Sequence, residues 1–286
     1  MWPWLKEELC VKRFSLRLED PQILTTSPVL PTFGLLILRL VITVICIATL
    51  IWSGVDAGND KWFIYLTNWS FTLLTMAFIS LTLLSIYGTY MTNKNKQNLV
   101  QYGTFETSVE AARRQEENFQ PSLNNRGNAV QICKWYHKLA WLICNIAFCV
   151  AFIVSSAYWL FQASNVDFID VITHGFNSVF VIIELLLGGV PIRLIHCIFC
   201  NVYCAVYVLF SVIYWQADGL NARGKPYIYK ILDYENQNAG VTTVLILSLA
   251  VIAPPLSQLF MLGMYKLRCH WYRRRTNPSS EHVISL

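Results

Sequence analysis

One threonine, one histidine and one aspartate in this chain have the types and spacing for nucleophilic chemistry inside a membrane. Thr67 and His174 lie near the ends of two long apolar segments. Counted along helices that rise 1.5 Å per residue, both groups should lie about 6–8 Å below the same membrane surface. A hydroxyl becomes a nucleophile when a base takes its proton, and a third group usually orients that base. Asp170 is the candidate for this third role, and a hydrogen-bonded brace between helices is the alternative interpretation.

Polar residues recur along one side of the segment that holds His174. Asp170, His174, Asn177, Val181 and Glu184 are spaced four, three, four and three residues apart. At 100° per residue they fall within about 80° of arc, so they form one stripe on a helix. Lipid would not tolerate this stripe, which must therefore face other helices or a wet cavity. The candidate pocket residues are Asn177 of this stripe, the adjacent Ser178, and Asn68, which follows Thr67.

A second pair of polar residues is matched in depth near the opposite membrane surface. Arg39 lies about two helical turns from the end of the first apolar segment, and Glu184 lies about two turns from the end of the fourth. Either charge left unpaired would cost about 2.5–3.5 kcal/mol on insertion scales. We therefore expect an intramembrane ion pair that pins the first and fourth segments together. A role in proton or ion movement is the alternative.

Six continuous apolar segments must position these residues. About 20 helical residues cross a hydrocarbon core of about 30 Å, and lipid forces the backbone to bond within itself. The segments are continuous rather than alternating, which excludes a barrel. Hydrophobic residues make up 55% of the chain, charged residues 14%, and the mean hydropathy is +0.43. We predict an all-α integral membrane protein, a six-transmembrane-helix bundle over residues 33–264, with tails at 1–32 and 265–286 and a loop at 88–137. The predicted spans are Phe33–Ser53, Phe63–Tyr87, Lys138–Phe161, Val171–Gly189, Leu194–Trp215 and Val241–Met264.

The positive charges predict the orientation of the bundle. Of the 22 lysines and arginines, Arg39 lies within a span, and the loops opposite the two tails hold only Lys61, Arg223, Lys225 and Lys230. By the positive-inside rule both termini are therefore cytoplasmic. The net charge of +5 is explained by anionic cytoplasmic lipid, so we expect membrane lipids as partners, another membrane protein as a further candidate, and no nucleic acid. Neither a phosphate-binding glycine loop nor a metal cluster is visible, so no cofactor and no metal are expected.

Three stretches resemble the rolling stone family of multipass membrane proteins, which is known in insects for a role in myoblast fusion. They are Lys61–Phe71 (KWFIYLTNWSF), His174–Ser178 (HGFNS) and Gly224–Asp233 (GKPYIYKILD). The resemblance extends from about Leu30 to Met264, with the long second loop and both tails outside it. It implies a role in cell fusion, and such a role implies the plasma membrane rather than the endoplasmic reticulum.

A more distant similarity links the chain to the androgen-induced-gene family of membrane hydrolases, which cleave fatty acid esters of hydroxy fatty acids with a threonine and a histidine. The run from Trp62 to Thr67 resembles the threonine motif of that family, with one extra residue. The run from Tyr229 to Leu232 resembles its Tyr-Pro-x-Leu motif. In its His-Gly-x-His motif the second histidine is catalytic, and Asn177 takes that position here. An amide cannot serve as a general base.

Three functional hypotheses follow from this departure. The favoured one is a non-enzymatic relative in which the pocket is a polar brace or a lipid-binding site. The alternative is a lipid-ester hydrolase in which His174, one turn or 5.4 Å from the usual base position, deprotonates Thr67. A transporter is the third, because Pro254 and Pro255 interrupt the sixth span, although shape alone explains them. We predict that the loop Gln216–Asn238 is a lid or a partner surface.

Overall fold

The computed structural model describes residues 3–58, 60–113, 132–162, 166–235 and 239–276, and within these ranges every regular element is helical. Six helical segments of the described chain are long and apolar enough to cross a membrane. The predicted all-α, six-span class is therefore confirmed, whereas the orientation of the termini stays a prediction. The six segments are Thr32–Ala57, Leu66–Lys94, Trp135–Phe161, Phe168–Leu187, Leu194–Gln216 and Gly240–Arg273.

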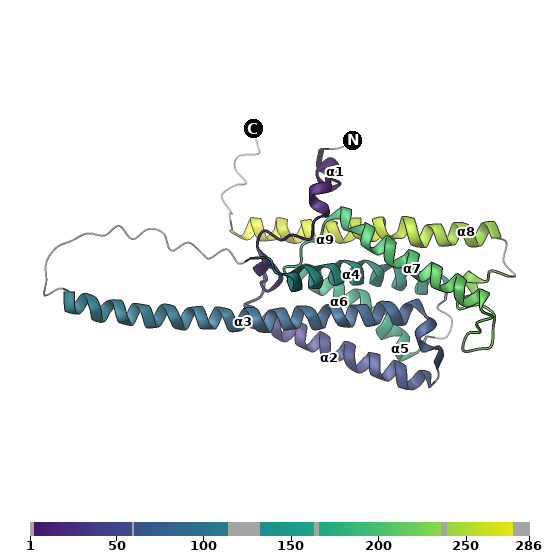
Figure 1. Ribbon diagram of the computed structural model, residues 1–286, viewed down its shortest axis with the longest axis horizontal. Coiled ribbons are helices and arrows are strands. Elements are labelled where there is room, and N and C mark those ends of the chain that lie inside the picture. Colours follow the sequence, from purple (N-terminus) through teal and green to yellow (C-terminus); the bar gives the residue numbers. More distant parts are fainter. Residues whose placement is uncertain (1–2, 59, 114–131, 163–165, 236–238, 277–286) are drawn as a thin grey trace.

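Nine α-helices and several short 3₁₀ and π segments make up the described elements, labelled as in Figure 1. The α-helices are α1 (Pro3–Glu8), α2 (Thr32–Ala57), α3 (Leu66–Arg113), α4 (Trp135–Phe161), α5 (Phe168–Asp170), α6 (Asn177–Leu187), α7 (Cys197–Gln216), α8 (Ala239–Leu247) and α9 (Ala253–Thr276). The short segments used below are the 3₁₀ helices η2 (Pro21–Leu24) and η3 (Asp60–Ile64), and the π-helices η4 (Val171–Phe176) and η7 (Ser248–Ile252).

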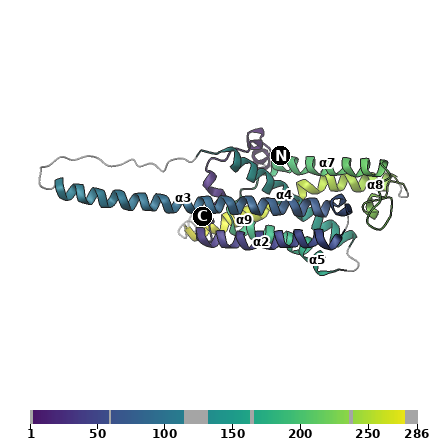
Figure 2. The same cartoon turned by 60° about the horizontal axis from the view of Figure 1, so that its bottom comes forward.

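Helix α4 is the centre of the bundle. It packs against α3, α6, α7 and α9, while α2 lies beside α3 at one edge (Figure 1). Small and aromatic side chains such as Ala147, Phe148 and Ala151 are fully buried along it, because neighbours cover it on several sides. The second half of α3 continues beyond the other helices, as both views show (Figures 1 and 2). The core therefore lies around α4, and the site is built against this helix.

The second span begins later than the apolar pattern predicts. Residues Asp60–Ile64 form the separate helix η3, and α3 starts only at Leu66. Side chains of α3 bond to carbonyls of η3: the Asn68 amide donates to the Trp62 carbonyl at 2.6 Å, and the Trp69 ring nitrogen donates to the Phe63 carbonyl at 2.5 Å. Thr67 consequently lies in the first turn of α3 rather than one and a half turns inside it.

The two prolines of the sixth span are accommodated by a π-helix. Proline has no backbone N–H, so Pro254 and Pro255 leave carbonyls of the preceding turn without their usual helical donors. The Asn201 side chain of α7 donates to two of these, the carbonyls of Ala250 at 2.7 Å and Val251 at 3.2 Å. One amide thus satisfies the backbone groups that the prolines release, as apolar surroundings require, and it ties η7 to α7.

Residues 20–31, which we call the N-terminal strap, pack into one end of the bundle. The Asp20 carboxylate accepts from the Gln22 amide at 2.9 Å and so begins η2, and Leu24 is fully buried. The Ser27 hydroxyl donates to the Leu187 carbonyl at the end of α6. A Cβ at Gly189 would collide with the backbone of the strap, so the backbone at Gly189 and that of the strap are in direct contact. This part of the predicted tail is therefore integral to the folded domain.

Candidate functional site

The first cluster of polar groups, which we call the ion-pair end, is centred on Arg39 and Glu184. Both side chains are fully buried. The Arg39 guanidinium donates from Nε and Nη2 to the two carboxylate oxygens, with Nε 3.0 Å from Oε2. Its Nη1 donates to the Leu24 carbonyl and to the Ser85 hydroxyl, each at 2.7 Å. The structure thus brings together the two charges that depth matching paired, and it adds the strap as a third partner.

A second arginine completes the ion-pair end. The Arg268 guanidinium of α9 donates to the carbonyls of Leu185 at 3.0 Å, Val190 at 3.3 Å and Gly188. The carbonyls of Leu185 and Gly188 lie at the C-terminus of α6, where carbonyls lack donors within their own helix and carry partial negative charge, and that of Val190 lies in the segment that follows. Any Cβ at Gly188 would strike the carboxylate of Glu184. The contact between Arg39 and Glu184 is bidentate, and the packing beside Glu184 leaves no space for an added atom. These features indicate a structural role for the ion-pair end.

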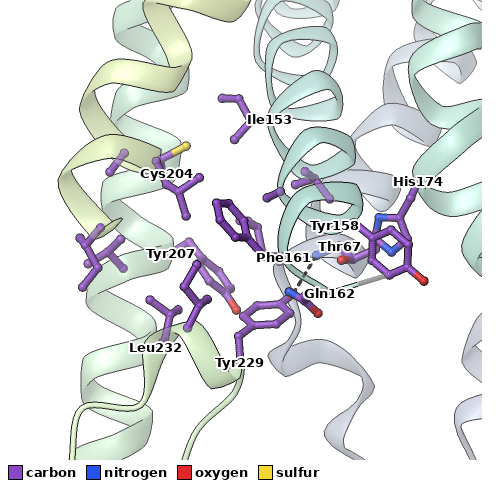
Figure 3. A pocket seen from close by; sticks show the side chains of 18 residues that line it. Thr67, Ile153, Tyr158, Phe161, Gln162, His174, Cys204, Tyr207, Tyr229 and Leu232 are labelled. Atoms are coloured by element: carbon purple, nitrogen blue, oxygen red, sulfur yellow. Dashed lines mark hydrogen bonds between the residues drawn. The ribbon is translucent and has the colours of Figure 1, made fainter. Parts of the chain in front are cut away.

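The other end of the bundle contains a cavity of about 80 Å³. Its walls are mainly apolar and come from α3, α4, α7, η4, α8, η7 and the loop before α8 (Figure 3). Polar groups also reach it, and we call this region the cavity end. The labelled lining residues are Thr67, Ile153, Tyr158, Phe161, Gln162, His174, Cys204, Tyr207, Tyr229 and Leu232.

His174 lies on the cavity wall, where its ring is held by stacking. The ring lies parallel to that of Tyr158, with the two centroids 3.7 Å apart and an angle of 3° between the planes. The side chain is 5% exposed, and among the described contacts its Nδ1 has no hydrogen-bond partner. Asp170 does not orient it: the Asp170 amide caps against the Asp167 carboxylate at 2.8 Å, and the Asp170 carboxylate lies close to the Tyr158 hydroxyl. Tyr158 therefore fills the positioning role assigned to Asp170.

Thr67 faces the same cavity and contacts a tyrosine of the loop. Its backbone amide donates to the Tyr229 hydroxyl at 3.4 Å. Burial raises the pKa of Tyr229, and hydrogen bonds from Thr67 lower it in part. Figure 3 shows Thr67 on the same side of the cavity as the stacked His174 and Tyr158. No hydrogen bond between the Thr67 hydroxyl and His174 occurs among the described contacts, so the two share a cavity without forming a nucleophile–base pair.

The predicted lid lies over this cavity. Of the loop Gln216–Asn238, the structure describes residues up to Glu235. The Ala222 amide donates to the Tyr65 hydroxyl at 3.4 Å, and the rings of Tyr65 and Tyr229 lie 5.7 Å apart in an edge-to-face contact. The Tyr234 hydroxyl bonds that of Ser211 on α7 at 2.8 Å. Through these contacts the loop is held against the bundle, and Tyr229 forms part of the cavity wall.

The three other predicted pocket residues lie elsewhere. Asn68 bonds the η3 backbone, and the Ser178 hydroxyl donates to that of Ser155 on α4 at 2.8 Å. Asn177 is 1% exposed, and both atoms of its amide lack hydrogen-bond partners among the described residues. None of the three lines the cavity. Asn68 lines a separate pocket beside Trp62 and Asp167, and a binding role for the three residues stays a prediction.

Two tyrosines on the cavity wall are not among the residues that the sequence predicts for the site. Tyr158 and Tyr207 lie inside apolar spans, where aromatic residues usually fill the core. The Tyr207 hydroxyl donates to the Ile64 carbonyl at 2.9 Å, and it holds η3 beside the cavity. A signal for Tyr158 was its position one turn before the end of the third span, where a polar tip can meet other polar groups. In the described residues no group of three metal-ligating side chains is found.

The fold and the site define the class: a multipass helical membrane protein with a sealed ionic cluster at one end and a cavity at the other. A family model described as "Protein rolling stone" matches residues 119–286, more than half of the 286-residue chain, so the chain belongs to the rolling stone family. The chain is also 26% identical over 234 residues to "Protein rolling stone" of Drosophila melanogaster. The aligned region covers 80% of this chain and 75% of the relative. No solved structure matches the chain. The match covers residues 119–137 of the predicted second loop and the C-terminal tail, so placing these two parts outside the resemblance was wrong.

Proposed function

We propose that the protein binds a single-chain lipid in the cavity, with the acyl chain among the apolar walls and the headgroup beside Thr67, His174 and Tyr229. The observation that carries this proposal is the stacked His174, which is held against an apolar cavity with its Nδ1 unbonded. Buried polar atoms in proteins are usually paired, and each unpaired one costs about 1–3 kcal/mol. A lipid headgroup supplies a partner for such an atom.

The alternative of a polar brace is weakened by the geometry. A brace needs direct hydrogen bonds between helices, as at the ion-pair end, where Arg39 bonds both Glu184 and Ser85. At the cavity end Thr67 bonds Tyr229 through its backbone amide, at 3.4 Å, and through its side chain, whereas the ring of His174 is held by stacking and its Nδ1 has no hydrogen-bond partner among the described residues. The stack orients His174 without pairing its Nδ1, and an unpaired polar atom beside an apolar cavity is typical of a binding site.

The experiment is a saturation-binding measurement with a tritiated long-chain fatty acid on purified protein in detergent. Val208 lines the cavity, whereas Val206 on the same helix is 52% exposed and does not. Val208→Phe fills much of a cavity of about 80 Å³ and should weaken binding at least tenfold. Val206→Phe makes the same change outside it and should bind like the wild type. Absence of saturable binding by folded wild type, or equal binding by both variants, would contradict the proposal.

A second candidate function, hydrolysis of lipid esters, is favoured by the presence of Thr67 and His174 in one cavity. In this reaction the Thr67 hydroxyl would add to the ester carbonyl as His174 takes its proton. The alcohol would leave with that proton, and water would then release the acid. A fluorophosphonate probe tests it: labelling of wild type that is lost in both Thr67→Ala and His174→Ala would establish the hydrolase. Unlabelled wild type beside a labelled active hydrolase would leave lipid binding as the function.

We further propose that the protein works at the plasma membrane in cell fusion, together with membrane lipids and a second membrane protein as partner. The support is the family resemblance and the multipass fold. Expression of tagged Val208→Phe and Val206→Phe in fusion-competent cells tests the link to the cavity. Surface staining should be equal for both, and only Val208→Phe should fuse poorly. Retention of the wild type in internal membranes would contradict this location.

A further inference from the structure

An open groove of about 520 Å³ runs along the side of the bundle between α4 and the sixth span. On α4 it extends from Phe152 to Phe161, about 14 Å at 1.5 Å per residue. Its walls are mainly apolar, with three serines among the lining residues, and its rim is strongly exposed, with Leu160 at 73% and Leu256 at 61%. In a membrane this face meets acyl chains, because the groove lies within two membrane-spanning segments.

The groove adjoins the cavity. Four residues line both spaces, and they are Ile153, Ala157, Phe161 and Leu249. Three come from the last turns of α4 and the fourth from η7, so the junction lies between these two elements. The polar groups of the cavity and the side of the bundle are therefore separated by only these four apolar side chains.

The shape of the groove fits the end of a chain rather than a channel. At its inner end the rings of Phe152 and Phe260 are in edge-to-face contact, with their centroids 5.1 Å apart. The hydroxyl of Ser257 is turned away into a bond with the Cys149 carbonyl at 2.9 Å. A chain that extends from the cavity would thus lie in a mainly apolar groove and end beside these two rings.

Both π-helices of the described chain border this route. Segment η4 carries His174 at the polar end of the cavity, and η7 carries Leu249 at the junction. A π segment inside a helix is rare and is found frequently at functional sites. The prolines after η7 and the Asn201 amide fix its position, so the junction is built by specific residues rather than by loose packing.

We infer that the groove is the binding site and the entry route for the distal part of the lipid chain. The chain passes between α4 and η7, and its headgroup lies beside His174. This inference rests on the proposed function and adds the kind of ligand and its path: an amphiphile with one chain, loaded sideways from the bilayer. A chain of this sort is the occupant because the junction is lined by apolar side chains, whereas the polar groups lie at the other end of the cavity.

The experiment uses the full-length protein in lipid nanodiscs with two palmitic acid probes, one with a diazirine near the carboxylate and one with it near the methyl end. After irradiation, mass spectrometry maps the labelled residues. The carboxylate-side probe should label cavity residues such as Tyr229, and the methyl-side probe should label Phe152, Leu256 or Phe260 in the groove. Excess unlabelled palmitic acid should remove both signals.

Two variants test the passage itself. Ala157 lies at the junction, and Ala157→Trp should reduce groove labelling by the methyl-side probe at least fivefold. Leu160→Trp enlarges a groove residue that does not line the cavity, and it should retain the labelling. Competed labelling of the cavity by both probes, with none in the groove, would overturn this inference and leave lipid binding intact. Absence of any competed labelling in folded wild type would overturn both. If Ala157→Trp does not fold, the wild-type map alone decides.

Discussion

Buried polar groups are fully hydrogen-bonded at one end of this bundle and incompletely hydrogen-bonded at the other. At the ion-pair end, Arg39, Glu184 and Arg268 are saturated with partners, and glycines leave no space around them. At the cavity end, His174 is stacked but has an unbonded nitrogen, and Tyr229 reaches in from a loop. Saturation with close packing indicates structure, whereas unbonded groups beside open space indicate binding. One helical segment, η4 followed by α6, contributes a residue to each end: His174 to the cavity end and Glu184 to the ion-pair end.

The largest effect is expected from breaking the ion pair. Arg39→Leu leaves the Glu184 charge buried and unpaired, which should lower the free energy of unfolding by about 3–5 kcal/mol. Glu184→Leu should cost a similar amount, and the double variant should recover part of the loss. Denaturant unfolding in detergent measures the cycle. Additive losses in the double variant would refute the energetic coupling of the pair.

The packing of the strap should give the next largest effect. Gly189→Ala places a methyl group against the carbonyl of Ile23 and should destabilise by about 1–3 kcal/mol through overpacking. Gly54→Ala is the matched control, because Gly54 is helical with open space around it, and it should stabilise by roughly 0.5–1 kcal/mol. Unfolding temperatures of the two variants should therefore move in opposite directions. Equal shifts would mean that the strap does not rest on this backbone.

Asn201→Leu should have an intermediate effect that extends to the cavity end. The change removes the donor to the carbonyls of Ala250 and Val251, and we expect a loss of about 1–2 kcal/mol. Because η7 borders the cavity, fatty acid binding should weaken as well. Stability and binding measured on one preparation would show both losses. A stable variant with wild-type binding would show that η7 is held by other contacts.

The smallest effect is expected at Asn177. Its buried amide is unpaired among the described residues and lies outside the cavity. Asn177→Leu has a similar volume and removes the unpaired atoms, so it should leave stability unchanged or raise it by up to about 1 kcal/mol. Fatty acid binding should be unaffected. A clear loss of stability would reveal that this amide has a partner in the membrane, and the contrast between the two ends would then be weaker.

The sequence predicted the helical class and the proximity of some polar residues better than it predicted their local contacts. Continuous apolar runs define the spans. Depth counted from the ends of the spans places Arg39 near Glu184, and it places Thr67 near His174, with which it lines one cavity. The late start of α3 depends on the side chains of Asn68 and Trp69, which bond back to η3. Such contacts leave no periodic signal.

The missed features have a common physical cause. The strap docks through single carbonyls, such as that of Leu24 on Arg39, and needs no apolar pattern. Tyr158 and His174 meet by stacking across two helices whose relative rotation the sequence does not specify. Asp170, four residues before His174, was the natural candidate for an orienting group on one helix, yet the π-helical turn between them alters that spacing.

The central claim, binding at one end and structure at the other, is tested most directly by the thermal shift that a saturating fatty acid produces. Ligand at 100 times its Kd stabilises the folded state by about 2.7 kcal/mol. We compare Thr67→Val and Tyr229→Phe at the cavity end with Ser85→Ala and Thr43→Val at the ion-pair end, where Thr43 bonds the Arg39 carbonyl. The ion-pair variants should unfold at lower temperature and keep the full shift, whereas the cavity variants should unfold near the wild-type temperature and lose most of it. A shift that is absent from the wild type, or equally reduced in both pairs, would contradict the account.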